Sequence, residues 1–337
     1  MDSIFGEGFA AMPEVRLACY AMATRFELIL VGEDEVYLRA AGEEALREIT
    51  RIEELLSIYR PTSELARVNR MAAERAVYVV PEVFSLLKAA KRLSLLTSGA
   101  FDMTIGPLVR LWRTCGEVKR MPSETEIEET RAAVGMQLVE LDEEAGTVRF
   151  LRPGVSLDPG AIGKGYAVDI AVRRLRENGI TCALLHGGSS TVYALGTPKG
   201  DSGWRVALRD PNGTEQAVVA VAELRDAALS VSAPHGRWFE VDGRRYGHVI
   251  EPSSGRPIEG VQLAATVTEF AMEGDAISTA LLVLGSAASP QLLQEPLGIY
   301  SALLIEMTKE QRRIYLFGSH FSETQTEIPL ERMPIFS

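Results

Sequence analysis

The order in which predicted helices and strands follow one another constrains the fold of this chain most. Apolar residues at spacings of three and four predict amphipathic helices over 34–57 and 81–97, and a further helix ends near Asn178. Apolar runs predict strands over 24–31, at "CALLHGG", on both sides of the turn in "GTVRFLRPGVSLD", and in a closing hairpin, "YSALLIEMT" with "RRIYLFG". Short strands are expected over most of 204–270, with a hairpin turn at "DG" in "FEVDGRRYGHVI". Because helices and strands mix without strict alternation, the predicted class is α+β.

Charge and composition exclude several classes of function. The chain of 337 residues carries a net charge of -11, which argues against broad binding to nucleic acid or to anionic membranes. Cys19, Cys115 and Cys182 form no CxxC pair and are expected to be buried free thiols. No apolar run reaches the ~18 residues of a membrane span. The start lacks the basic and apolar regions of a signal peptide, and "VRLAC" lacks the apolar segment of a lipoprotein signal. We therefore expect a cytoplasmic protein.

The stretch "DPGAIGKGYAVD", residues 158–169, is the first candidate binding site. It is not a P-loop, because a glycine rather than Ser or Thr follows Lys164, and it lacks the third glycine of a dinucleotide fingerprint. Gly160, Gly163 and Gly165 let the backbone approach a ligand closely, and the helix that follows presents N–H groups and a positive dipole end. With the charge of Lys164, the stretch is either a site for phosphate or another anion, or a plain strand-turn-helix junction.

Two further segments carry candidate side chains. In "GDAISTALLVLG", Asp275 is predicted in the first turn of a helix, and Thr279 lies four residues later on the same face. This pair offers either two hard oxygen ligands suited to Mg²⁺, or a capping acid and a threonine bonded to the preceding turn. In "YGHVIEPSSGRPIEG", His248 ends a predicted strand and is either a structural histidine or an acid/base or pyrophosphate contact.

Seven segments follow one another in an order typical of one protein family. They are "MATRFEL", "LSIYRPTSELARVN", "GAFDMTIGPLVRLW", the 158–169 stretch, "GWRVALRDP", "HVIEPSSGRP" and "DAISTALLVLG". On these segments, over about 20–320, the chain resembles the FAD:protein FMN transferases, also called ApbE-like proteins. The resemblance implies an ApbE-like α+β fold of mixed sheets packed with helices in two associated lobes. It implies one domain over 19–325, an N-terminal extension over 1–18 and a C-terminal tail over 326–337.

The resemblance also implies a reaction. Such enzymes bind FAD and Mg²⁺, cleave the pyrophosphate, release AMP and attach FMN through a phosphoester to a threonine of an acceptor flavoprotein with a Ser/Thr-Gly-Ala-type motif. Chemistry of this kind needs mainly positioning and charge neutralisation at the phosphoryl group. Two alternatives stay open: an FAD pyrophosphatase that yields FMN and AMP, and a flavin-binding protein that has lost turnover.

Carried over position by position, the resemblance assigns roles to individual residues. The catalytic residues would be His248, Asp275 and Lys164. The metal ligands would be the side chains of Asp275 and Thr279 and the backbone carbonyl of Ala161. The residues that line the flavin and phosphate pocket would be Met22, Tyr59, Ser63, Glu64, Asp102, Thr104, Asp158, Lys164 and His248. For Ser63, Glu64 and Asp102 the alternative is a role in turns and helix caps, and for Tyr59 it is a core aromatic.

The chain departs from the family pattern at four places. Ser189 stands where the family has Asp or Asn after Gly-Gly, Ser232 and Ala233 stand where it often has Ser-Gly, and Gly247 precedes His248 where a second histidine is usual. These three departures bear on the adenosine side, and those at Ser189 and Ser232 motivate the binding-protein alternative. Ala23 replaces the glycine of Met-Gly-Thr and has less backbone freedom.

Overall fold

A nine-stranded sheet forms the centre of the fold. The computed structural model describes residues 13–213, 217–234, 238–241, 244–295, 298–309, 311–323 and 328–333. Within these residues the strand order is β1 (Glu14–Ala21), β2 (Thr24–Val31), β6 (Ala183–Gly187), β7 (Thr191–Leu195), β10 (Ala227–Ser232), β15 (Val261–Thr268), β16 (Ile299–Met307), β17 (Arg312–Gly318) and β19 (Leu330–Met333). Neighbouring strands are antiparallel, except that β17 and β19 are parallel.

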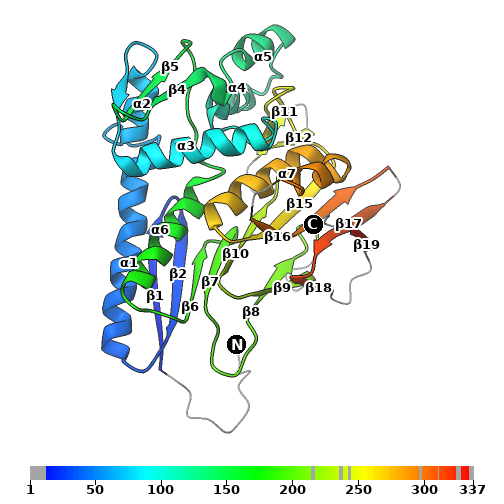
Figure 1. Ribbon diagram of the computed structural model, residues 1–337. Helices are drawn as coiled ribbons and strands as arrows, with labels where there is room; N and C mark the ends of the chain where they lie inside the picture. The colour runs from blue at the N-terminus through cyan, green and yellow to red at the C-terminus, as the bar shows by residue number, and fades with distance from the viewer. Residues whose placement is uncertain are drawn as a thin grey trace.

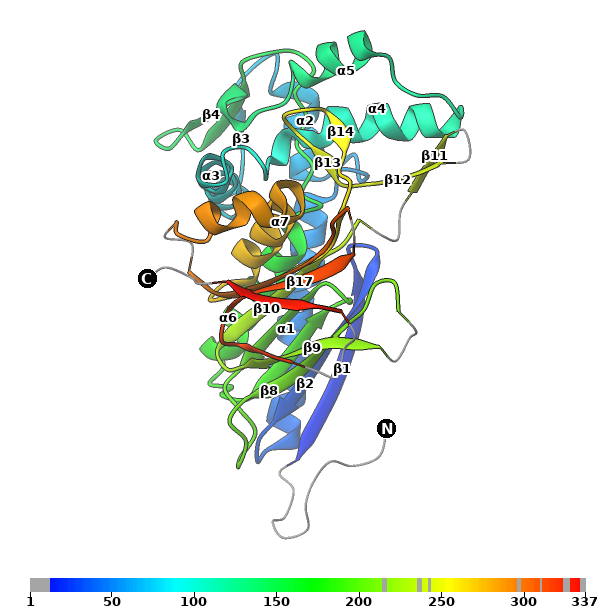
Figure 2. The same ribbon diagram turned by 90° about the vertical axis from the view of Figure 1, so that its right-hand side faces the viewer.

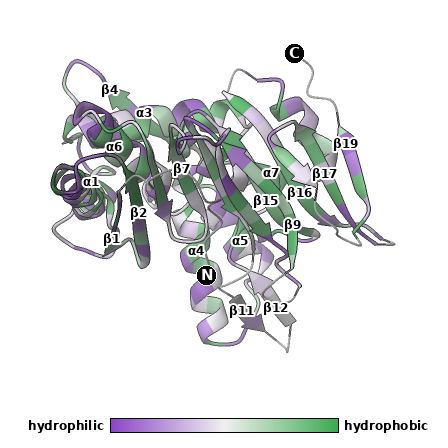
Figure 3. Ribbon diagram, turned by 90° about the horizontal axis from the view of Figure 1, so that it is seen from below, coloured by the Kyte–Doolittle hydropathy of each residue, from purple (hydrophilic) through white to green (hydrophobic). Residues whose placement is uncertain are grey.

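Both faces of this sheet are covered. On one face lie α1 (Glu35–Leu56), α6 (Gly163–Glu177) and α7 (Ala271–Leu292), side by side (Figure 1). Against the other face packs a three-stranded sheet of β18 (Phe321–Glu323), β9 (Val218–Leu224) and β8 (Trp204–Arg209), visible in Figure 2. Strands buried on both faces are apolar along their whole length, and Figure 3 shows β15 and β16 mostly in the hydrophobic colour.

A second group of elements lies beyond the end of the sheet (Figures 1 and 2). It holds α2 (Glu64–Met71), β3 (Val77–Tyr78), α3 (Pro81–Leu96), η1 (Met103–Ile105), α4 (Gly106–Glu117), α5 (Glu124–Arg131), η2 (Met136–Leu138), β4 (Val139–Asp142), β5 (Thr147–Phe150), β11 (Trp238–Val241), β12 (Arg244–Gly247), β13 (Ile250–Glu251) and β14 (Arg256–Pro257). Apolar side chains from α3 and β5 join those of α1 and β2 in one continuous core.

The α+β class predicted from the sequence is confirmed. The amphipathic helix at 34–57 is α1, which Asp34 caps by accepting the N–H of Tyr37 at 3.0 Å. The helix at 81–97 is α3, with proline at its first position. The closing hairpin is β16 with β17. No helix in the described residues combines the length and the apolar character needed to cross a bilayer.

The sequence misjudged three stretches. The second strand expected after the Arg-Pro-Gly turn is absent, because the N–H and the carbonyl of Leu157 bond to the amide of Asn69 at 2.7 and 2.9 Å instead of to a strand. β1 begins at Glu14, ahead of the domain start expected at residue 19, and pairs along its whole length with β2. β19 lies inside the expected C-terminal tail and pairs with β17. The turn expected at "DG" lies outside the described residues, although β11 and β12 pair on either side of it.

Candidate active site

The first turns of α6 and α7 touch at Gly165. A Cβ atom at this position would lie 2.2 Å from the carbonyl oxygen of Ala271, so only glycine lets the two helices approach so closely. The N–H of Gly165 donates to Oδ2 of Asp275 at 2.7 Å. Gly165 lies in the first turn of α6, where a backbone N–H has no partner within the helix, so Asp275 supplies the acceptor that this N–H lacks. Ala161 lies just before α6, which begins at Gly163.

The carboxylate of Asp275 is the buried centre of this region. α7 begins at Ala271, so Asp275 lies in its second turn and not, as the sequence predicted, in its first. Its residue is 6% exposed, and its Oδ1 accepts a hydrogen bond from Thr191 Oγ1 of β7 at 2.7 Å. Burial raises the pKa of Asp275, while the charge of Lys164 and hydrogen bonds from Thr191, Ser230 and Gly165 act to lower it. The predicted anion site and the predicted metal ligand thus lie together.

Three hydroxyl groups gather beside Asp275. Thr279 Oγ1 and Ser278 Oγ donate to the backbone carbonyl of Asp275 at 3.0 and 3.1 Å. Ser232 Oγ of β10 lies 2.8 Å from Ser278 Oγ and 3.3 Å from Thr279 Oγ1. Thr279 therefore bonds to the preceding turn of the helix, which is the contact expected if it has a structural role. Because a hydroxyl that donates its proton keeps two acceptor lone pairs, this bond leaves Thr279 able to bind a cation.

The oxygen atoms around Asp275 fit a hard cation. The expected set comprises one carboxylate, the hydroxyl of Thr279 and the carbonyl of Ala161, all of them ligand types that Mg²⁺ accepts. No group of three His, Cys, Asp or Glu side chains in the described part of the chain is arranged to hold a metal ion. A cation here would thus depend on hydroxyl and carbonyl ligands. A buried carboxylate also calls for a compensating positive charge.

Met22 and Arg60, the residue after Tyr59, share Glu53 as a hydrogen-bond partner. Met22 and Ala23 form the two-residue turn between β1 and β2, with φ angles of 50° and 58°. Glu53 of α1 accepts the N–H of Met22 at 2.8 Å and an N–H of Arg60 at 3.2 Å. Tyr59, next to Arg60, is 73% exposed. It is not a core aromatic, and its ring is open to a ligand.

Four other predicted pocket residues contact the protein itself. Ser63 accepts a backbone N–H at the start of α2 at 3.0 Å, and Glu64 accepts the N–H of the residue before α3 at 2.8 Å. Asp102 accepts the N–H of Thr104 at 2.8 Å, and Thr104 Oγ1 accepts the N–H of Gly135 at 2.6 Å. For Ser63, Glu64 and Asp102 these contacts are those of the turn-and-cap alternative.

Asp158 opens the loop that leads to α6. Its Oδ1 accepts the N–H of Gly160 at 2.8 Å. Its negative charge acts on Arg110 of α4, whose pKa is nevertheless lowered, mainly by burial. The guanidinium of Arg110 donates to Ser156 Oγ at 2.9 Å. The loop between β5 and α6 is thus tied to α4.

His248 is half-buried on a bend between β12 and β13. The hairpin that follows it is held from α4 and α5. Trp112 Nε1 donates to the carbonyl of Gly255 at 2.7 Å, and Arg131 donates to the carbonyl of Ser253. These contacts fix the chain just beyond His248.

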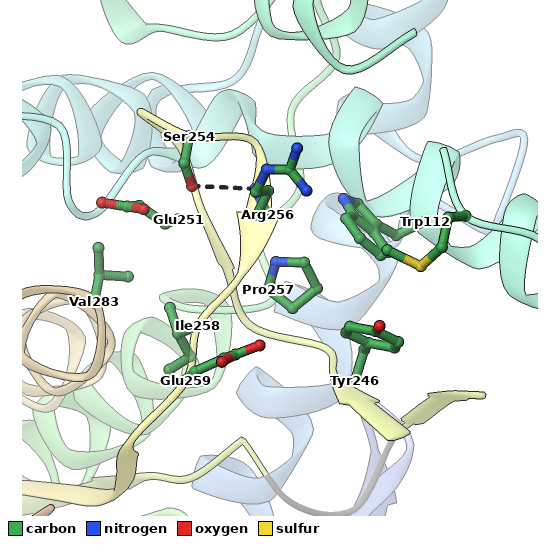
Figure 4. A pocket seen from close by; sticks show the side chains of 10 residues that line it. Trp112, Tyr246, Glu251, Ser254, Arg256, Pro257, Ile258, Glu259 and Val283 are labelled. Carbon is green, nitrogen blue, oxygen red and sulfur yellow. Dashed lines mark hydrogen bonds between the residues drawn. The ribbon is translucent and has the colours of Figure 1, made fainter. Parts of the chain in front are cut away.

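A cavity of about 360 Å³ lies along the same hairpin. Figure 4 shows Trp112, Tyr246 and Pro257 on one side of the hairpin and Glu251 and Val283 on the other. Its lining residues are Trp112, Met121, Tyr246, Glu251, Ser254, Arg256, Pro257, Ile258, Glu259 and Val283. None of them is a predicted site residue, but Val283 lies one helical turn beyond Thr279 in α7.

Sequence reasoning missed two residues that support the site. Thr191, which binds Asp275, sits in a strand far along the chain, and no local pattern indicates such a contact. Asn69, which ends the segment "LSIYRPTSELARVN", holds the chain before Asp158 through Leu157. An asparagine near the end of α2 carries no local signal for a partner 88 residues away.

Comparison with known proteins gives consistent matches. The sequence profile of the ApbE family matches residues 22–304. The FAD:protein FMN transferase of Vibrio cholerae is 32% identical over 276 residues, 81% of this chain and 82% of the relative, and one from Klebsiella pneumoniae is 32% identical over 266 residues, 77% and 82%. The crystal structure of the ApbE protein from Thermotoga maritima superposes with a TM-score of 0.79 at 28% identity, covering 93% of this chain and 97% of that one. The flavin transferase ApbE of Vibrio cholerae gives 0.76 at 27%, covering 92% and 98%.

Proposed function

The chain belongs to the ApbE family, and from this premise we propose that it is an FAD:protein FMN transferase that depends on Mg²⁺. Its substrates would be FAD and a threonine of an acceptor flavoprotein with a Ser/Thr-Gly-Ala-type motif, and its products AMP and the flavinylated acceptor. The observation that carries the proposal is the contact between Asp275 and the N–H of Gly165, which joins a buried carboxylate to the predicted anion site at Lys164.

Asp275, Thr279 and the carbonyl of Ala161 would hold the cation. Bound there, Mg²⁺ would neutralise negative charge on the pyrophosphate of FAD. Lys164 and the first turn of α6 would bind the phosphates through charge and N–H groups. The flavin ring would lie near Met22 and the exposed ring of Tyr59.

Transfer forms a bond between the threonine oxygen and the phosphorus of the FMN moiety, and breaks the bond from that phosphorus to the oxygen of AMP. The threonine proton passes to a base. Asp275 and His248 are the two candidate bases. Five residues would shape the pocket indirectly, by hydrogen bonds that hold the backbone of the turns around it: Ser63, Glu64, Asp102, Thr104 and Asp158.

The direct test is covalent flavin on an acceptor. Purified protein is mixed with FAD, Mg²⁺ and a flavoprotein domain that bears an acceptor threonine, and the denatured domain is examined for flavin fluorescence. We expect a fluorescent band that disappears with Asp275→Ala, with EDTA, and with a Thr→Val acceptor.

The same mixture separates the alternatives. Release of AMP without covalent flavin would mean an FAD pyrophosphatase, and intact FAD would mean a flavin-binding protein, as the departures at Ser189 and Ser232 suggest. Replacing Mg²⁺ by Mn²⁺ tests the choice of metal, since both prefer oxygen ligands. A cytoplasmic location stays a prediction, which cell fractionation tests.

A further inference from the structure

Asp169 lies in the second turn of α6 and faces the start of α7. Its two oxygens accept the N–H groups of Ala271 and Met272, both at 2.8 Å. These are the first two N–H groups of α7, which have no partner within the helix. Phe270, which precedes α7, has an apolar side chain that cannot accept a hydrogen bond from these N–H groups. The cap of α7 therefore comes from another helix.

The two helices exchange carboxylates at their N-termini. Asp169 of α6 caps α7, while Asp275 of α7 accepts the N–H of Gly165 in the first turn of α6. Each carboxylate thus lies at the positive end of the other helix's dipole. Between these two contacts, Gly165 lies directly against Ala271. The arrangement fixes both the height and the rotation of α7 against α6.

We propose that Asp169 is a positioning residue for the carboxylate of Asp275, a role that rests on the proposed function and deepens it. Asp275 lies four residues beyond Ala271, about 6 Å along the helix. A shift at the start of α7 therefore moves Asp275 away from its donors, Gly165 and Thr191, both at 2.7 Å. Such bonds weaken steeply once donor and acceptor separate beyond about 3.2 Å. Loss of Asp169 then lowers turnover without removing any group that touches FAD.

The test compares Asp169→Asn and Asp169→Glu with a matched control. In Asp169→Asn the side-chain amide keeps one acceptor oxygen, but its NH₂ group replaces the other oxygen and cannot accept an N–H of α7. In Asp169→Glu the side chain keeps its negative charge. The control is Asp34→Asn, which alters another aspartate that caps a helix, far along the chain from the site. Two readouts are taken: hydrogen exchange of peptides 163–168 and 271–276, and steady-state AMP release from FAD with Mg²⁺ and the acceptor domain.

For Asp169→Asn at about pH 8, above the pKa of about 7 that burial gives Asp169, we expect exchange to rise about 10-fold or more in both peptides, the loss expected for bonds to a charged group. We expect kcat to fall about 10-fold or more, with KM for FAD within about twofold of wild type. Asp169→Glu should recover part of the lost kcat. Asp34→Asn should confine any change in exchange to the start of α1 and leave kcat unchanged.

Two results would overturn the proposal. One is a kcat for Asp169→Asn equal to that of Asp34→Asn. The other is that Asp169→Asn speeds exchange in peptide 271–276 but not in peptide 163–168. The Gly165 amide in 163–168 reports the contact with Asp275, so this result would mean that Asp275 has kept its position without Asp169. If Asp169→Asn does not fold, Asp169→Glu is judged by the same two criteria. If the wild type releases no AMP, the transferase proposal fails, and exchange in 163–168 still decides whether Asp169 positions Asp275.

Discussion

Replacing Gly165 by alanine tests the contact on which the site is built. The new Cβ would lie 2.2 Å from the carbonyl oxygen of Ala271, whereas ordinary contact begins at 3.4 Å, so the helices must separate by the difference. Such a separation breaks the 2.7 Å bond from the Gly165 N–H to Asp275. Overpacking costs about 1–3 kcal/mol, and the lost bond to a charged group about 1.5–3 kcal/mol. Alanine returns about 1 kcal/mol through helix propensity.

The expected net loss for Gly165→Ala is therefore about 1.5–5 kcal/mol in the free energy of unfolding, together with loss of AMP release. Urea unfolding followed by circular dichroism measures the first, and a coupled AMP assay the second. Gly116→Ala is the matched control, because Gly116 lies in the last turn of α4, away from the site. If Gly165→Ala is as stable and as active as Gly116→Ala, the close approach of α6 and α7 at this residue is refuted.

Three further predictions follow from the site and its supports. Ala23→Gly should raise the free energy of unfolding by about 1 kcal/mol, because alanine at φ 58° is in the left-handed region; an unchanged urea midpoint would contradict this. Burial raises the pKa of Asp169 to about 7, from about 3.9 in an unfolded chain. Between these pH values the folded protein keeps a proton that the unfolded chain has lost. The free energy of unfolding should therefore fall as the pH rises from about 4 to about 7. Asp169→Asn should make the free energy of unfolding depend less on pH over this range. A pH profile of the melting temperature identical to that of the wild type would contradict this prediction. Trp112→Phe should cost about 1–3 kcal/mol, because the Gly255 carbonyl loses its donor, and should slow turnover if the hairpin positions His248; wild-type stability would argue against that bond.

Periodicity was enough to predict the long elements and part of the site. The spacing of apolar residues located α1 and α3 within two residues of their ends. The four-residue spacing of Asp275 and Thr279 correctly indicated one helix face. The glycines of the 158–169 stretch correctly indicated a helix N-terminus there, although Gly163 and Gly165 form its first turn instead of preceding it.

The parts that the sequence did not predict depend on distant residues. Leu157 is extended without forming a strand because Asn69 supplies its hydrogen bonds, and nothing near Leu157 in the sequence indicates this. The bond from Thr191 to Asp275 requires that β7 lie beneath α7, which follows from strand order and not from local pattern. The start of β1 depends on its pairing with β2 along its whole length, which the local sequence around Glu14 does not indicate.

The most direct test of the central claim is the ratio of AMP released to FMN covalently attached, measured in one reaction with FAD, Mg²⁺ and the acceptor domain. A transferase in which the acceptor hydroxyl attacks the FMN phosphorus yields one AMP for each FMN attached, and Asp275→Ala abolishes both products. AMP in large excess over covalent flavin, or the same yield of both products with Asp275→Ala, would contradict the account.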